Sequence, residues 1–336
     1  MPLPVSIVIP TLNCRGEIEP HLAALKRWYH EAEEVIVVDS ESDDGTAEWL
    51  RENVDHPRAK FCSRPRGLYA AWNFGVSQCH AEFVYFATVG DEIIPEGVRK
   101  LVEVAKQFDA EVVISPPRMI DIKGNPVKSA SWPIHRFLHY AKPVDALLLS
   151  DRQKFVLTTS FGIGGLLGSS ASNLYQRATL ALKPFPEHFG HAGDSLWGRQ
   201  HCSSLRIALS ANSWAAFVTE DSKVSEAFTD GGCIDKHRQL DEASLREALC
   251  LPDGDFKAEA LLMLEGRDAF QEWVCSKITE LEHLRSTCEQ QLEYIQTLEE
   301  ACSDRLKEMD RRGGEIERLR KKLNSTLGRR LISLFR

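Results

Sequence analysis

The sequence has little of what membrane-spanning, disulfide-bonded or zinc-binding proteins need. None of its apolar runs reaches the roughly 18 to 20 residues of a spanning helix. The nearest approach, residues 155–171, is broken by four glycines and is predicted to be a loop. Nine cysteines, an odd number without a CxxC pair, predict reduced thiols rather than disulfides or a zinc site. No charged segment or cleavage site precedes the first strand, so no signal peptide is expected.

An excess of basic residues is also missing. The net charge of −8 excludes nucleic-acid binding by the chain as a whole. With 336 residues, of which 43% are hydrophobic and 27% charged, the chain is predicted to form a cytoplasmic protein of about two domains.

The first hundred residues alternate short apolar runs with helical patterns. Residues 5–9, 34–39 and 59–62 read as short strands. The first two are apolar in continuous runs rather than in alternation, which is typical of a parallel sheet buried on both faces. Helical spacing follows each of them, so the order predicts βαβ units and a Rossmann-like α/β fold.

Residues 83–95 form the most informative of these runs. Apolar residues fill most of 83–89 and predict a buried strand; Gly90 then ends it, and two acids, Asp91 and Glu92, precede Pro95. Ligands bind at the carboxyl ends of such strands. A carboxylate there either meets a ligand or caps the following helix, and the rest of the sequence favours the ligand.

Four motifs in order carry a resemblance: VSIVIPTLN, EVIVVDSESDDGT, GLYAAWNFGV and VYFATVGDEIIP. Over about residues 4 to 97 the chain resembles family 2 glycosyltransferases of the GT-A fold, of the type that acts in bacterial surface-polysaccharide biosynthesis. HFGHAGDSLWGRQ, residues 188–200, resembles the acceptor-side motif of this family. The resemblance implies a mostly parallel sheet with flanking helices, followed here by a helical, coiled-coil extension.

The resemblance also implies where a nucleotide-sugar donor, expected to be a UDP-sugar, binds. An ionised carboxylate such as Asp39 accepts hydrogen bonds only, which suits a uracil or ribose donor group. The alternative for the loop after it is that Ser42, Asp43 and Gly45 merely cap a helix. The residues expected to contact the donor nucleotide are Pro10, Thr11, Asn13, Asp39, Ser40, Ser42, Arg66, Gly67 and Asn73.

The metal motif of the family is only half present. Val89 stands where the first acid is usual, and Asp91 matches the second, which implies Asp91 as the ligand of Mg²⁺ or Mn²⁺. One carboxylate suffices where diphosphate oxygens supply the other ligands. Glu92 either contacts the acceptor or the sugar, or its side chain simply faces solvent.

Asp194 matches the catalytic base of the family, which in an inverting transfer removes the proton of the acceptor hydroxyl. Its alternative role is to cap the helix that follows. Gly193, Trp197 and Arg199 are expected to contact acceptor or sugar, although Trp197 also suits a core. His188, His191 and His201 crowd the same segment without a clear metal-binding pattern.

Beyond residue 230 the resemblance ends. We predict a glycosyltransferase domain over 1–230, a helical connector over 231–273, a coiled coil over 274–324 and a basic amphipathic tail over 325–336. From Val274 to Leu323 apolar residues recur every seven positions, which predicts a homo-oligomer, or else a helix folded back on the domain. The pair Gly313 and Gly314 predicts a break.

The last 26 residues carry nine Lys and Arg against two Glu, a local charge of +7. Such a segment suits peripheral contact with an anionic membrane, and equally a basic coiled-coil end. We therefore expect an inverting glycosyltransferase with a glycan or lipid-linked acceptor. The alternatives are an inactive scaffold and a nucleotidyltransferase. A nucleotidyltransferase needs a Gly-rich, Lys-bearing loop after the first strand, and residues 10–13 are not such a loop.

Overall fold

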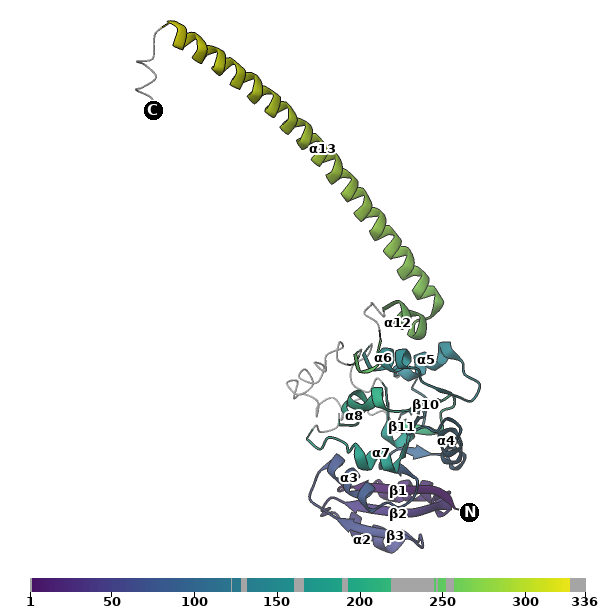
Figure 1. Cartoon of the computed structure of the whole chain (residues 1–336). Helices are drawn as coiled ribbons and strands as arrows, with labels where there is room; N and C mark the ends of the chain where they lie inside the picture. Colours follow the sequence, from purple (N-terminus) through teal and green to yellow (C-terminus); the bar gives the residue numbers. More distant parts are fainter. Residues whose placement is uncertain are drawn as a thin grey trace. The chain divides into compact units, whose positions relative to one another are not determined.

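A computed structural model describes residues 2–121, 123–127, 132–159, 166–188, 193–218, 245, 247–251 and 257–326 (Figure 1). The chain divides into two compact units, residues 1–269 (unit 1) and residues 270–336 (unit 2). The finer predicted division at residues 230, 273 and 324 stays a prediction.

Four parallel strands form the first half of the main sheet, in the order β3-β2-β1-β4. Their bounds are Leu3–Thr11 (β1), Ala32–Asp39 (β2), Ala59–Ser63 (β3) and Phe83–Phe86 (β4). The apolar side chains of β1, β2 and β4 are buried on both faces of the sheet, as continuous apolar strands require. This part confirms the predicted fold.

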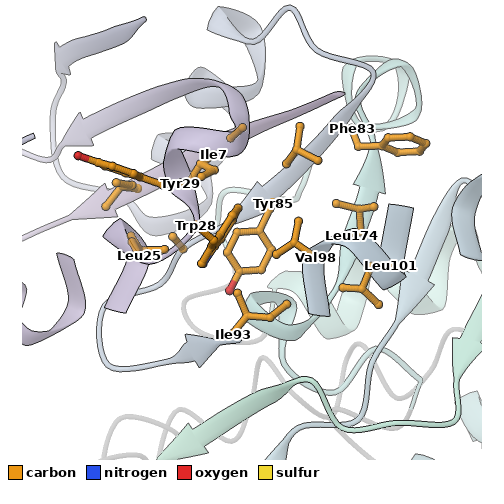
Figure 2. Packing of buried hydrophobic residues seen from close by; sticks show 14 of the residues in the cluster. Ile7, Leu25, Trp28, Tyr29, Phe83, Tyr85, Ile93, Val98, Leu101 and Leu174 are labelled. Carbon is orange, nitrogen blue, oxygen red and sulfur yellow. The ribbon is translucent and has the colours of Figure 1, made fainter. Parts of the chain in front are cut away.

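Helices cover both faces and follow the predicted rhythm: Ile18–Lys26 (α1), Thr46–Asn53 (α2), Leu68–Gln78 (α3) and Pro95–Phe108 (α4). On one face Trp28 meets the edge of Tyr85, with ring centres 5.6 Å apart, and Val98 of α4 packs beside them (Figure 2). On the other face Trp72 of α3 stacks on Phe86 at 4.4 Å. These two aromatic contacts fix both helix layers to β4, the strand that leads to Asp91.

The second half of the sheet is mixed. Leu174–Gln176 (β9) runs antiparallel between β4 and Val112–Ile114 (β6). Ile207–Ser210 (β10) lies parallel to β6, and Ala146–Leu148 (β8) forms the antiparallel edge. A separate small sheet joins Glu92–Ile93 (β5), Ala215–Val218 (β11) and Arg118–Ile120 (β7). These strands have only two to four residues, too few to show a periodicity in the sequence.

The loop that we predicted over residues 155–171 is wrong for its first five residues, whereas residues 166–169 are turn and irregular structure. Asp151–Thr159 is a helix (α6), because Phe155, Val156 and Leu157 all bury their side chains against the core. Residues 160–165 lie outside the described part of the chain, and Ser170–Ser172 forms a 3-10 turn (η2).

Unit 1 has further short helical elements among its described residues. They are Tyr29–Glu31 (η1), Pro133–Ala141 (α5), Arg177–Leu182 (α7), Gly193–His201 (α8), Cys202–Ser204 (η4) and Lys257–Leu264 (α12).

Gly266–Thr326 is one helix of 61 residues (α13), which makes up the described part of unit 2. It passes through Gly313 and Gly314, so the predicted break is wrong; two glycines lower helix stability without interrupting a helix of this length. The basic tail from residue 327 on lies outside the described residues. Among those that are described, no helix combines the length and apolar character that a membrane crossing needs.

Candidate active site

The strand ends of β1 and β2 bring the first group of predicted donor residues together. Thr11 pairs with Asp39 across the sheet, and its hydroxyl donates a hydrogen bond of 3.0 Å to the Asp39 carboxylate. Ser42 donates two more, from its backbone nitrogen at 2.9 Å and its hydroxyl at 2.6 Å. The buried Asp39 is thus held as an acceptor at the carboxyl edge of the sheet, where ligands bind in this class of fold.

The two loops at this edge are tied to each other by their own polar groups. Asn13 adopts a left-handed backbone with φ of 47°. Its backbone nitrogen donates to the Ser42 hydroxyl at 2.9 Å, and its side-chain oxygen accepts from the Asp43 backbone at 2.9 Å. Of the three residues named as possible caps, Gly45 stands at the N-cap of α2, and Asp44 beside it accepts from the Thr46 backbone at 3.0 Å. Ser42 therefore serves the loop pair and not the helix.

Two further residues predicted to contact the donor, Arg66 and Asn73, lie in different surroundings. Arg66 is exposed and lies 3.6 Å from the Asp43 carboxylate, so its guanidinium faces the same loop. Asn73 corrects our expectation: its amide nitrogen donates to Phe185 O at 2.8 Å, and its amide oxygen accepts from Phe185 N at 2.9 Å. Both ends of the amide fasten the segment before α8 instead of facing a nucleotide.

Asp91 follows a tight turn in which its backbone nitrogen donates to Thr88 O at 3.1 Å. Gly90 has a φ of 99°, a conformation that other residues rarely adopt, so the turn needs glycine there. Burial raises the pKa of Asp91 to about 7, and hydrogen bonds from the Val218 backbone and the Ser169 side chain oppose this rise. The carboxyl group therefore points into the protein and sits close to half-protonated at neutral pH.

The surroundings of Asp91 supply little else for a metal ion. Val89 packs on the hydrophobic core, and Glu92 forms an ion pair with Arg27. His21 lies under the turn, and its burial lowers its pKa to about 4, so it adds no positive charge. Within the described ranges, no three His, Cys, Asp or Glu side chains gather as a metal site. Asp91 thus fits a divalent cation as a single protein ligand, with the rest left to a bound diphosphate.

Of the three histidines in residues 188–201 the structure describes two, and neither joins a cluster of metal-binding side chains within the described residues. His188 is exposed, His201 is partly buried on α8, and His191 lies outside the described residues.

Asp194 lies in the first turn of α8 and accepts three hydrogen bonds. The Tyr69 hydroxyl and the Ser170 hydroxyl donate to its two oxygens at 3.0 Å each, and the Ser195 backbone donates at 2.7 Å. Burial raises the pKa of Asp194, while these donors oppose the rise. A carboxylate with a raised pKa takes up a proton more readily than an exposed one, which is what a general base needs.

Ser169 and Ser170 connect the two acids. Ser169 contacts Asp91 and the next residue, Ser170, contacts Asp194. Because consecutive Cα atoms are 3.8 Å apart, side chains of this size place the two carboxyl groups within at most about 15 Å of each other. Both acids therefore lie around one segment, residues 169–172, which leads into the amino end of β9.

Three predicted acceptor contacts look different in the structure. Trp197 is fully buried and its indole nitrogen donates to Lys183 O at 2.6 Å, so it is a core residue and the expected sugar stacking is wrong. Gly193 is buried against Tyr69: a Cβ there would lie 2.4 Å from the ring, so glycine allows the Tyr69–Asp194 contact. Arg199 is partly buried, and its Nε finds no hydrogen-bond partner within the described residues.

Sequence reasoning missed Tyr69, Ser169 and Ser170 as part of this site. Tyr69 was interpreted as packing, and its ring is indeed buried, but its hydroxyl reaches Asp194. Tyr175 extends the network by donating to Ser170 at 3.1 Å. The signal in the sequence is the Gly- and Ser-rich stretch 162–173, which contains both serines and resembles the flexible acceptor segment of the family.

Asp39 and Asp91 follow parallel strands of an α/β sheet, at the carboxyl edge where ligands bind in this class of fold. The family model described as Glycosyl transferase family 2 matches residues 6–162, so this part of the chain is similar to the glycosyltransferases of family 2, as the resemblance predicted.

Solved structures give the same fold. TarS 1–349 of S. aureus in complex with UDP-GlcNAc is 18% identical, with a TM-score of 0.54, over 78% of this chain and 72% of that chain. TarS 1–349 crystallised as such is 19% identical, with a TM-score of 0.52, over 74% and 69%. At these identities the likeness shows the GT-A fold and no more. The comparison with curated proteins finds no match.

Proposed function

We propose that the chain transfers a sugar, with inversion, from a nucleotide-diphosphate donor to a hydroxyl group of a glycan or lipid-linked acceptor. The observation that carries this proposal is the pair Ser169 and Ser170, whose side chains contact Asp91 and Asp194. An inverting transfer needs two acids with separate tasks, one near the leaving diphosphate and one at the acceptor. A UDP-sugar is the proposed donor, since TarS 1–349 was crystallised with UDP and with UDP-GlcNAc.

The donor nucleotide would bind at the edge formed by β1 and β2. Asp39 would accept a hydrogen bond from the base or ribose, because its carboxylate has acceptor capacity beyond the bonds from Thr11 and Ser42. Pro10 and Ser40 flank it, and Ser40 N is fixed to Thr11 O at 2.8 Å. Arg66, exposed beside Asp43, is in place to approach a phosphate.

Asp194 would act as the general base. As the acceptor oxygen attacks the anomeric carbon, its proton passes to the Asp194 carboxylate, and the bond from the sugar to the diphosphate oxygen breaks with its electron pair. Tyr69 and Ser170 hold the carboxylate in one orientation from two sides. Oδ1 accepts from both Tyr69 and Ser195 N, whereas Oδ2 accepts from Ser170 and keeps a lone pair for the incoming proton.

Asp91 would hold a divalent cation, Mg²⁺ or Mn²⁺, together with donor phosphate oxygens. When bound, such an ion neutralises charge on the departing nucleotide diphosphate. Ionisation of Asp91 has to accompany its binding, because the pKa of about 7 leaves part of the population protonated at neutral pH. The contacts proposed for Glu92 and Arg199 at the acceptor side belong to the same hypothesis.

The acceptor class, the cytoplasmic location and the peripheral membrane contact rest on the sequence. The basic residues beyond 326 are the proposed membrane segment. Binding to vesicles with and without anionic lipid, compared between the full chain and a chain ending at residue 326, tests this point.

The experiment for the main proposal is UDP release from a panel of UDP-sugars, with Mn²⁺ and with a chelator, followed by analysis of the anomeric configuration of the product. We expect one donor to be turned over, metal to stimulate the release, and the configuration to invert. Retention of configuration would overturn the mechanism. Thermal stabilisation by donors without any turnover would instead favour an inactive scaffold.

A further inference from the structure

Helix α13 carries a column of exposed apolar side chains along unit 2. Leu281, Ile295, Met309 and Ile316 lie at multiples of seven residues and are between 49% and 67% exposed. Cys288 and Cys302 occupy the same column. Further leucines flank the column on both sides, so the apolar surface is a stripe and not a set of isolated residues.

The length of this stripe limits what can cover it. A helix of 61 residues is about 90 Å long, whereas α4, the longest described helix of unit 1, has 14 residues and spans about 21 Å. A repeat of seven fits only another helix with the same repeat. Covering the stripe would bury on the order of 1,000 Å² in each copy, enough for a specific interface. A second copy of the chain offers the identical stripe.

We propose that α13 pairs with α13 of a second copy as a parallel, in-register coiled coil. The charges beside the column select this orientation. Charged residues line both edges of the column, and each edge is called a flank here. In a parallel pair, a residue on one flank of the first helix lies beside the residue five positions later, on the opposite flank of the partner helix. Lys277 then meets Glu282, and each pair forms twice by symmetry.

The same spacing joins Arg305 to Asp310 and Arg312 to Glu317. No pair at this spacing along either flank of the column joins like charges.

An antiparallel pair would place equivalent flanks side by side. The flank that contains Glu282, Glu289, Asp310 and Glu317 has no basic residue, so acids would then face acids. Charged residues within the stripe, such as Glu299, have to turn towards water in either orientation, so they do not distinguish the two.

Sedimentation of the full chain tests the pairing. Ile295→Asp places a charge in the column, while Thr297→Asp places the same charge on the opposite side of the helix and serves as the matched control. We expect the wild type and Thr297→Asp to sediment as at least two copies, and Ile295→Asp to sediment as a monomer. A monomeric wild type at about ten micromolar, or equal behaviour of the two variants, would overturn the proposal.

Oxidation tests the orientation. In the parallel arrangement the two Cys302 side chains face each other, whereas an antiparallel pair centred on the helix separates them by roughly 15 Å. In a full chain carrying Cys288→Ser, diamide should produce a covalent dimer on a non-reducing gel, and the additional change Cys302→Ser should abolish it. A multimer that forms no Cys302 crosslink would exclude the parallel register. Neither result depends on the proposed sugar transfer, which is measured by UDP release.

Discussion

Asp39 and Asp194 are both acids at the carboxyl side of the sheet, yet they are held in opposite ways. The partners of Asp39 are Ser42, three residues further on, and Thr11, which is 28 residues away in sequence but directly opposite on the paired strand β1. The partners of Asp194 are Ser170 and Tyr69, which are 24 and 125 residues away in sequence. Asp39, the acid proposed to bind the donor, is held by one pair of neighbouring strands and the loop that follows. Asp194, the proposed base, depends on the packing of three separate segments.

The first prediction concerns the acid held by distant segments. Asp194→Asn keeps the shape and one acceptor but cannot take up a proton, so kcat should fall by about 10²- to 10⁴-fold. The affinity for UDP, measured by calorimetry, should stay unchanged because Asp194 lies away from the Asp39 edge. Full steady-state activity in this variant would remove Asp194 from the mechanism.

The second prediction concerns the acid held locally. Asp39→Asn places an amide where three donors point at a carboxylate, so the Kd for UDP should rise by about 10- to 100-fold. At saturating donor, kcat should change much less than in Asp194→Asn. The exposed neighbour Glu41→Gln is the control and should bind UDP like the wild type. Equal UDP affinity in Asp39→Asn and wild type would contradict the donor site.

The third prediction separates positioning from catalysis. Tyr69→Phe removes one donor to Asp194, and kcat should fall by about tenfold, the free energy of one hydrogen bond to a charged group. Because the Tyr69 bond lowers the pKa of Asp194, its loss should shift the acid limb of the pH–rate profile to higher pH. A superimposable profile would mean that Tyr69 serves packing alone. Tyr140→Phe, at an exposed tyrosine, is the matched control.

The fourth prediction uses the buried state of Asp91. Its pKa of about 7 lies above the ordinary 3.8, so between these values the folded protein keeps a proton that the unfolded chain has lost. Stability is therefore lost as the pH rises through this window, and the loss is complete above pH 7. Asn has no proton to lose, so the free energy of unfolding of Asp91→Asn relative to the wild type should rise from pH 4 to pH 8 by up to about 4 kcal/mol, at about 1.4 kcal/mol for each pKa unit. Urea unfolding of both proteins at the two pH values measures it, and a difference that stays constant with pH would contradict the buried carboxyl.

Local patterns were enough for the parts of the fold and site that are built locally. The continuous apolar strands and the helices between them predicted the first half of the sheet, since strand burial and helix periodicity are written in neighbouring residues. The motif around Asp39 was recognisable for the same reason. The short strands β5, β7 and β9 were not, because two or three residues carry no period.

The sequence by itself determined the α/β class, the glycosyltransferase family and the positions of Asp39, Asp91 and Asp194, because each of these is a property of a short stretch of chain. Only the tertiary structure decided the surroundings of the acids: that Tyr69 and Ser170 hold Asp194, that Asn73 fastens a loop, and that Trp197 is core. The physical reason is that hydrogen bonds and burial between residues far apart in sequence arise only when the segments pack, and no local pattern records them.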